Sequence, residues 1–174
     1  MINRDKLKPV IEKYKTYFPM HWRNSIDGGV SCKWEAVECF REHWDIDAPD
    51  FADMLSQALA KTGSLLNTAH FFAGGILIAM ARAEGETVRQ MFRDLYDDTQ
   101  DLAQRITDFE AAAEKIRAAH DDGIWNSHYQ HANAISTYLW LRYPEKYYIY
   151  KYTVCHDVAV TLEADFQPKG NSAA

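Results

Sequence analysis

A proline at position 144 separates the most continuous apolar helical pattern of the chain from its densest run of tyrosines. Before Pro144, apolar residues recur at helical spacing over 132–143 and leave little of the helix for water. Proline lacks an amide hydrogen and disfavours helical geometry in the preceding residue, so the helix is expected to end there. The aromatic and β-branched residues of 146–152, KYYIYKY, suit a short strand or a pinned extended segment. The stretch therefore predicts a central buried helix that leads into an extended, tyrosine-rich segment.

Helical periodicity also dominates the rest of the chain. Pro9 fits the first of the predicted helices only if it lies in the first turn, and 64–73 is expected to form a turn and a short connector. No strands and helices alternate in the manner of a nucleotide-binding sheet. We therefore predict an all-α fold of about seven or eight helices with one short strand pair near 146–152. Besides the central helix, the predicted helices cover 5–17, 32–44, 51–62, 76–84, 87–96, 100–120 and 153–162.

Length and composition favour one compact domain inside the cell. At 174 residues and 47% hydrophobic, the chain can bury one sizeable core, so a single domain is expected over 1–166. The small and polar residues 167–174 are expected to form a disordered tail. The longest apolar run, 71–81, is shorter than the roughly 20 residues that span a bilayer. Three cysteines without metal-like spacing suit reduced thiols, so a cytoplasmic protein without membrane contact is predicted.

A mixture of basic and aromatic residues is the main candidate site. The chain as a whole has a net charge of −6, so a nucleic-acid contact would need a local basic patch. Lysine and arginine can pair with phosphates while tyrosine rings stack on bases. The alternative is that the tyrosines pack one ring face and the lysines solvate the edge of the segment. The candidate nucleic-acid-binding residues are Lys13, Lys15, Arg23, Arg142, Lys146, Tyr148, Tyr150 and Lys151.

Catalytic and metal chemistry finds little support in the sequence. The glycine pairs at 28–29 and 74–75 lack the following lysine and hydroxyl residue of a phosphate-binding loop, so no nucleotide hydrolysis is expected. His128 and His131 could face one metal ion near His120 and His156, but a hydrogen-bonding role is commoner for such histidines. The acidic pairs 97–98 and 121–122 fall at predicted helix ends, where solvated capping is expected. We predict no catalytic residue, no metal ligand and no cofactor.

Several strings of the chain resemble one protein family. The segment 138–152, YLWLRYPEKYYIYKY, is similar to a YLFLRYPDKYYIYKY segment in the N-terminal region of McrB-like AAA+ proteins, the motor subunits of modification-dependent restriction systems. The segment 126–130, NSHYQ, departs slightly from the Asn-His-Tyr-Gln of other members. The similarity extends over about 33–168, and its other strings are KWEA at 33–36, FREHWDID at 40–47, DFA at 50–52, LAKT at 59–62 and VRQMFRDLYDD at 88–98.

The resemblance implies a recognition domain. McrB-like proteins form ring-shaped motors that pair with a nuclease subunit, and their variable N-terminal regions commonly recognise the target. On this basis the chain is expected to be a non-catalytic N-terminal domain that senses foreign or modified DNA. The tail at 167–174 would then lead to an AAA+ motor that this chain does not contain. The alternative is a protein–protein docking or regulatory domain of the same system that makes no contact with DNA.

Overall fold

The structure is a computed structural model that describes residues 2–21, 31–120 and 126–168. Contacts divide the chain into two compact units, which are described separately below. Unit 1 comprises 1–32 and 150–174, and unit 2 comprises 33–149. The single domain predicted over 1–166 stays a prediction, and most of the predicted tail, 169–174, lies outside the described residues.

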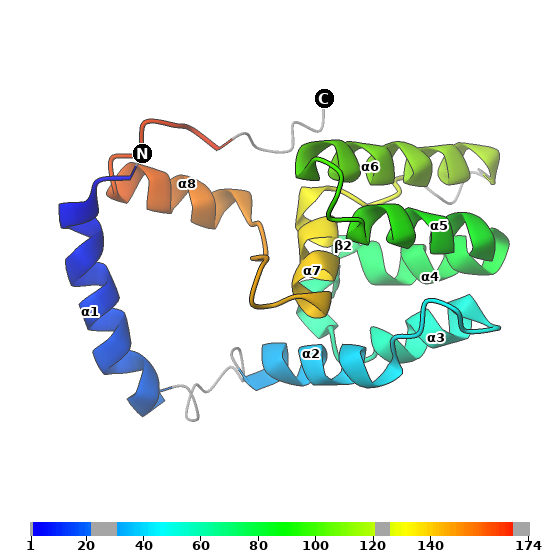
Figure 1. Cartoon of the computed structure of the whole chain (residues 1–174), viewed down its shortest axis with the longest axis horizontal. Coiled ribbons are helices and arrows are strands. Elements are labelled where there is room, and N and C mark those ends of the chain that lie inside the picture. The colour runs from blue at the N-terminus through cyan, green and yellow to red at the C-terminus, as the bar shows by residue number, and fades with distance from the viewer. Residues whose placement is uncertain (1, 22–30, 121–125, 169–174) are drawn as a thin grey trace. The chain divides into compact units, whose positions relative to one another are not determined.

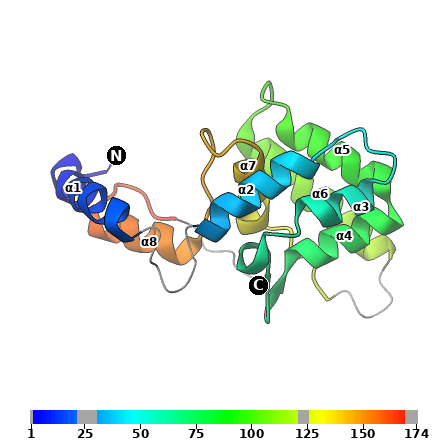
Figure 2. The same ribbon diagram turned by 90° about the horizontal axis from the view of Figure 1, so that it is seen from below.

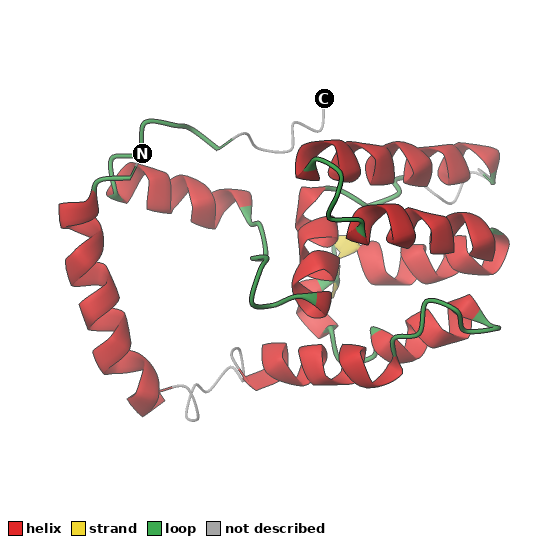
Figure 3. Ribbon diagram, in the orientation of Figure 1, coloured by secondary structure: helices red, strands yellow, loops and turns green. Residues whose placement is uncertain are grey.

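Unit 2 is a helical bundle with one small sheet, which confirms the predicted all-α class (Figures 1 and 3). Helices α4, α5 and α6 pack against one another, α3 lies against α4 and α5, and α7 contacts α6. Helix α2 lies beside α7, where the rings of Trp34 and Trp140 are 5.7 Å apart (Figure 2). The helices are α2 (Ser31–His43), α3 (Phe51–Ala58), the 3-10 helix η1 (Gly63–Leu65), α4 (Ala73–Ala83), α5 (Gly85–Tyr96), α6 (Leu102–Ala119) and α7 (Ala132–Arg142).

Side-chain caps and a close backbone contact set several helix boundaries. Asp50 caps α3 by accepting a hydrogen bond from the amide of Asp53 at 2.9 Å. Helix α4 begins three residues earlier than the predicted start at 76 and includes both glycines of the pair 74–75. A Cβ atom at Gly75 would clash with the ring of Phe72, so glycine lets this ring approach the helix.

An aromatic cluster forms the centre of the core of unit 2. Phe92 on α5 is fully buried, and its ring centroid lies within 5.0–5.7 Å of four other rings, those of Trp44, Tyr96, Phe109 and Tyr138. Such edge-on aromatic contacts add to the free energy gained by burying apolar surface. Phe92 therefore connects α5 with α6, α7 and the end of α2.

The strand pair lies elsewhere than predicted. It joins β1 (Asn67–Thr68) to β2 (Phe71–Phe72) in antiparallel register, within the segment expected to be a connector. The prediction of a strand pair near 146–152 was wrong, because 147–151 form no regular structure. After α7 the amides of Lys146 and Tyr147 both donate to the carbonyl of Tyr143 at 3.0 Å. The backbone therefore turns instead of offering these groups to a neighbouring strand.

Unit 1 contains α1 (Arg4–His21) and α8 (Tyr152–Thr161). The amide of Asn3 donates to the carbonyl of Leu162 at 2.9 Å, and Lys6 pairs with Glu163 at 2.7 Å. The prediction that Pro9 lies in the first helical turn was wrong, because it is the sixth residue of α1. Pro9 has no amide hydrogen to donate to the carbonyl of Asp5, four residues earlier. Both residues are exposed, so water can reach this part of the helix.

Candidate nucleic-acid interface

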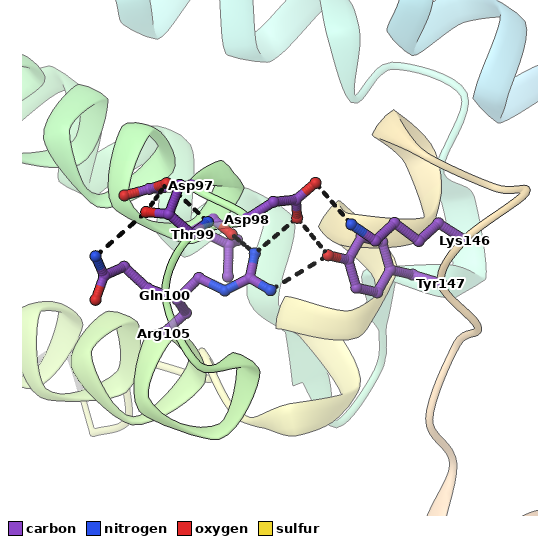
Figure 4. A network of polar contacts seen from close by, with 8 residues as sticks. Asp97, Asp98, Thr99, Gln100, Arg105, Lys146 and Tyr147 are labelled. Atoms are coloured by element: carbon purple, nitrogen blue, oxygen red, sulfur yellow. Dashed lines mark hydrogen bonds and ion pairs between the residues drawn. The ribbon is translucent and has the colours of Figure 1, made fainter.

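A polar network within unit 2 holds the first residues of the tyrosine segment, Lys146 and Tyr147 (Figure 4). Tyr147 is buried, and its hydroxyl donates to Oδ1 of Asp98 at 2.8 Å. Nη2 of Arg105 in turn donates to the Tyr147 hydroxyl at 3.3 Å. Asp98 was predicted to be a solvated capping residue, and this was wrong, since it receives hydrogen bonds from α6 and from the tyrosine segment. The network therefore links the α5–α6 connection to the chain that follows α7.

Lys146 is already paired within this network. Its Nζ lies 2.6 Å from Oδ2 of Asp98, and both side chains are about half exposed. The hydrogen bond to Asp98 raises the pKa of Lys146. The hydrogen bonds from Lys146 and then from Tyr147 lower the pKa of the Asp98 carboxyl. A phosphate would have to compete with Asp98 for the Lys146 ammonium group.

Arg105 is a buried cation that organises the same region. Its Nη1 donates to the carbonyl of Leu95 at 2.8 Å and lies 3.4 Å from Oδ1 of Asp98, while only 6% of the side chain is exposed. Its Nε is buried and finds no hydrogen-bond partner within the described part of the chain. The guanidinium of Arg105 thus fixes the end of α5. The sequence alone did not single out Arg105 as a candidate residue. The available signal was a cation placed within the apolar stripe of α6, one turn before Phe109.

Tyr148 and Arg142 remain accessible at the surface of unit 2. Tyr148 is 82% exposed, the largest value among the described large hydrophobic residues. The half-buried Arg142 places its guanidinium 5.4 Å from the ring centroid of Tyr143. Within 31–120 and 126–168 no ion pair engages Arg142, so its charge can still be paired with a phosphate.

The basic residues predicted at 13 and 15 lie on one exposed helix. Lys13 and Lys15 flank the exposed Tyr14 on α1, and Tyr17 is also exposed one turn later. Lys15 makes only a 3.6 Å contact with Glu12, with both side chains largely exposed. A surface pair of this kind contributes little, so among the described residues neither Lys13 nor Lys15 has a partner that would compete strongly with an external anion. Arg23 lies outside the described residues.

The last two predicted site residues belong to the start of α8 in unit 1. Lys151 is exposed, and its carbonyl accepts the amide of Cys155 at 2.9 Å. Tyr150 is half-buried, and this burial raises the pKa of its hydroxyl. Lys13, Lys15, Tyr150 and Lys151 therefore share unit 1. The other described candidates, Arg142, Lys146 and Tyr148, lie in unit 2.

Charge is divided unequally between the two units. Unit 1 has eight Lys and Arg residues against six Asp and Glu, whereas unit 2 has eleven against nineteen. Helix α1 alone carries five basic and two acidic residues. The acidic balance of the whole chain therefore arises in unit 2, and unit 1 has the electrostatic character that polyanion binding needs.

A second buried cation, Arg89, was also missed by sequence reasoning. It donates to the carbonyls of Ile46 and Ala48, pairs with Glu86 at 2.9 Å and lies over the ring of Phe51. A cavity of about 640 Å³ adjoins this cluster at the beginnings of α3 and α5. Each of the three guanidinium nitrogens of Arg89 donates to the protein, so Arg89 holds the 46–48 loop in place.

Searches for other chemistry and for related proteins gave no positive result. In the described ranges, no three His, Cys, Asp or Glu residues are placed to hold a metal ion, and no helix has the length and apolarity to cross a bilayer. Comparisons with protein-family models, with curated proteins and with solved structures found no match to the chain.

Proposed function

We propose that this chain is a non-catalytic recognition domain of an McrB-like restriction system, and that it senses foreign or modified DNA through the basic, aromatic surface of unit 1. The observation that carries the proposal is the concentration of positive charge on α1, with Lys13 and Lys15 beside exposed tyrosines. Exposed lysines can release counterions from DNA while exposed rings stack on unpaired or flipped bases. The resemblance of 33–168 to McrB-like N-terminal regions supports the restriction context.

Tyr148 and Arg142 offer a separate candidate contact in unit 2, since both are accessible and no carboxylate among the described residues pairs with Arg142. Lys146 is expected to contribute less, because Asp98 already neutralises it. Unit 2 as a whole is acidic, so it would act as the scaffold and repel DNA from its remaining surface.

The proposal is tested by fluorescence anisotropy with the full chain and labelled duplexes, unmodified or carrying 5-methylcytosine, and with single strands. Binding is expected to weaken as salt rises, with a log–log slope that reflects the number of phosphates contacted. The double variant Lys13→Ala/Lys15→Ala should reduce that slope by about 2, since each lysine accounts for roughly one phosphate contact.

The matched control is Lys33→Ala/Lys61→Ala, which removes the same charge from exposed positions of unit 2. This control should bind as the unaltered chain does. Equal losses in both double variants would point to non-specific attraction, and no binding to any of the nucleic acids by the folded chain would refute DNA sensing.

Docking to another protein of the same system is the second candidate function. The observation that favours docking is a group of exposed apolar side chains in unit 1, since only single exposed apolar residues are ordinary on a protein surface. On α1 they recur at helical spacing, as expected for a helix that lies in a partner's groove. These side chains are Val10, Ile11, Tyr14 and Tyr17 on α1, and Val154, Val158 and Val160 on α8.

Calorimetric titration of the chain with the AAA+ motor and with the nuclease subunit of the same system would test docking. Val10→Ser/Ile11→Ser should abolish binding heat, whereas Phe72→Ser, which alters an exposed ring of unit 2, should not. Unchanged heat in the α1 variant would exclude this helix as the docking surface.

A further inference from the structure

A buried histidine in unit 2 is held in one protonation state by a main-chain hydrogen bond. The amide of Gln130 donates to Nδ1 of His128 at 2.9 Å, and His128 is only 9% exposed. A ring nitrogen that accepts this bond carries no proton, so the neutral ring must bear its hydrogen on Nε2. Burial lowers the pKa of His128, and the neighbouring His131 lowers it further.

Gln130 extends this contact into the core. Its Nε2 donates to the carbonyls of Ala73 at 2.9 Å and of His128 at 2.8 Å, and its Oε1 accepts the hydroxyl of Tyr138 at 2.7 Å. Gln130 and Tyr138 are both fully buried. Through these bonds the turn before α7 is tied to the first residue of α4 and to the central helix.

The same turn contains a residue in a conformation that side chains disfavour. Tyr129 has φ of 55°, in the left-handed region that is strained for a residue with a side chain. Its ring contacts that of Phe71 in β2 at a centroid distance of 6.2 Å. Tyr129 is flanked in sequence by His128 and Gln130, so their hydrogen bonds hold the turn in this conformation.

Charged groups surround His128 on both of the elements that face it. His131 lies in the same turn, with ring centroids 4.6 Å apart, and contacts Glu110 of α6 at 3.7 Å. From α6, Glu114 favours the protonated ring, while Arg117 opposes it. Arg117 is itself paired with Glu114 at 2.7 Å, so the attraction of this carboxylate for a second cation is reduced.

We propose that His128 is a proton-operated latch on the turn 127–130. When a proton from solvent adds to Nδ1 of His128, this nitrogen can no longer accept a hydrogen bond from the Gln130 amide. Two N–H donors then face each other in a buried environment. The protonated ring also gains a positive charge beside His131 and Arg117. A buried donor without a partner is unfavourable, so the turn 127–130 moves out of its folded position. Tyr129 then leaves the left-handed conformation, and the contact of its ring with Phe71 is lost. The latch therefore couples acidification to release of the β1–β2 hairpin from the start of α7.

The latch is tested by NMR on the full chain. The ¹⁵N shifts of the His128 ring report which nitrogen is protonated, and amide exchange of Gln130 reports release of the turn. We expect a neutral ring protonated on Nε2 at about pH 7.5. After correction for intrinsic exchange, protection of the Gln130 amide should fall at least about tenfold by about pH 5, below the ordinary histidine pKa of 6.5.

Two variants separate the latch from general acid destabilisation. Asparagine places a non-titrating oxygen near the position of Nδ1, so His128→Asn should keep the Gln130 amide protected across the whole range. His131→Asn removes a neighbouring charge and should shift release to higher pH. Loss of protection in His128→Asn equal to that of the unaltered chain would overturn the latch, as would titration of His128 with no change at Gln130.

Discussion

The hydroxyl of Tyr147 lies 2.8 Å from Oδ1 of Asp98, although the two residues are 49 positions apart in the chain. This hydrogen bond explains why the tyrosine-rich segment is not a strand. Its first buried ring enters a polar network with Arg105, while the next residue, Tyr148, is left at the surface. The segment is thus held by side chains instead of by a backbone ladder.

Removing this hydroxyl should weaken unit 2. Tyr147→Phe keeps the ring but deprives Asp98 of a donor and Arg105 of an acceptor, which should cost about 1–2 kcal/mol of the free energy of unfolding. Urea denaturation followed by circular dichroism measures this loss. Tyr148→Phe, at an exposed position, should have no measurable effect, and equal stability of the two variants would contradict the proposed role of the network.

Acid should destabilise the fold partly through Asp98. Hydrogen bonds from Lys146 and Tyr147 hold the pKa of Asp98 below its ordinary value of 3.8 in the folded chain. The unfolded chain therefore takes up this proton first, so the contribution to stability is complete above about pH 5 and is lost as pH falls through 3.8 toward the folded pKa. Unfolding midpoints in urea at several pH values should fall less steeply in Asp98→Asn. If the urea midpoint fell equally with decreasing pH in Asp98→Asn and in the unaltered chain, Asp98 would not be the source of this loss of stability.

The buried Arg89 should matter far more than its exposed neighbour. Arg89→Ala leaves the carbonyls of Ile46 and Ala48 without donors, at about 1–3 kcal/mol for each buried group. Arg93→Ala removes an exposed pair with Asp47 and should cost less than about 1 kcal/mol. Thermal unfolding compares the two directly, and similar losses would show that Arg89 does not hold the 46–48 loop.

The aromatic centre of unit 2 should tolerate truncation poorly. Phe92→Ala removes a fully buried ring that contacts five others and should cost about 3–5 kcal/mol. Tyr148→Ala, which truncates a ring that is 82% exposed, should change stability by less than about 0.5 kcal/mol. Chemical denaturation of both variants decides the point, and a loss under about 1 kcal/mol for Phe92→Ala would place the core elsewhere.

Periodicity along the chain was enough to predict the helical class and most helix positions. The apolar residues from Phe51 onward gave the start of α3, because helical periodicity depends on near neighbours in sequence. The start of α4 was missed, since glycines at 74–75 normally argue against a helix. Close approaches in three dimensions, of Asn67 to Gly74 and of the Phe72 ring to Gly75, account for these two glycines.

The candidate site was predicted less completely than the fold. Exposure of Tyr148 and of Lys13 fits their selection as binding residues. The pairing of Lys146 with Asp98 and the buried role of Arg105 depend on contacts across many residues of sequence, which spacing along one helix cannot reveal. The strand expected at 146–152 failed for the same reason, because residue propensity competes with such distant hydrogen bonds.

The most direct test of DNA recognition is a ¹⁵N–¹H NMR titration of the full chain with a duplex that carries 5-methylcytosine, at low and at moderate salt. The account predicts amide shifts concentrated at Lys13–Lys15 of α1, at Tyr148 and at Tyr150–Lys151, which diminish as salt rises. The amides of α4–α6 should stay unchanged. Shifts confined to α4–α6, or none anywhere in the folded chain, would contradict the account.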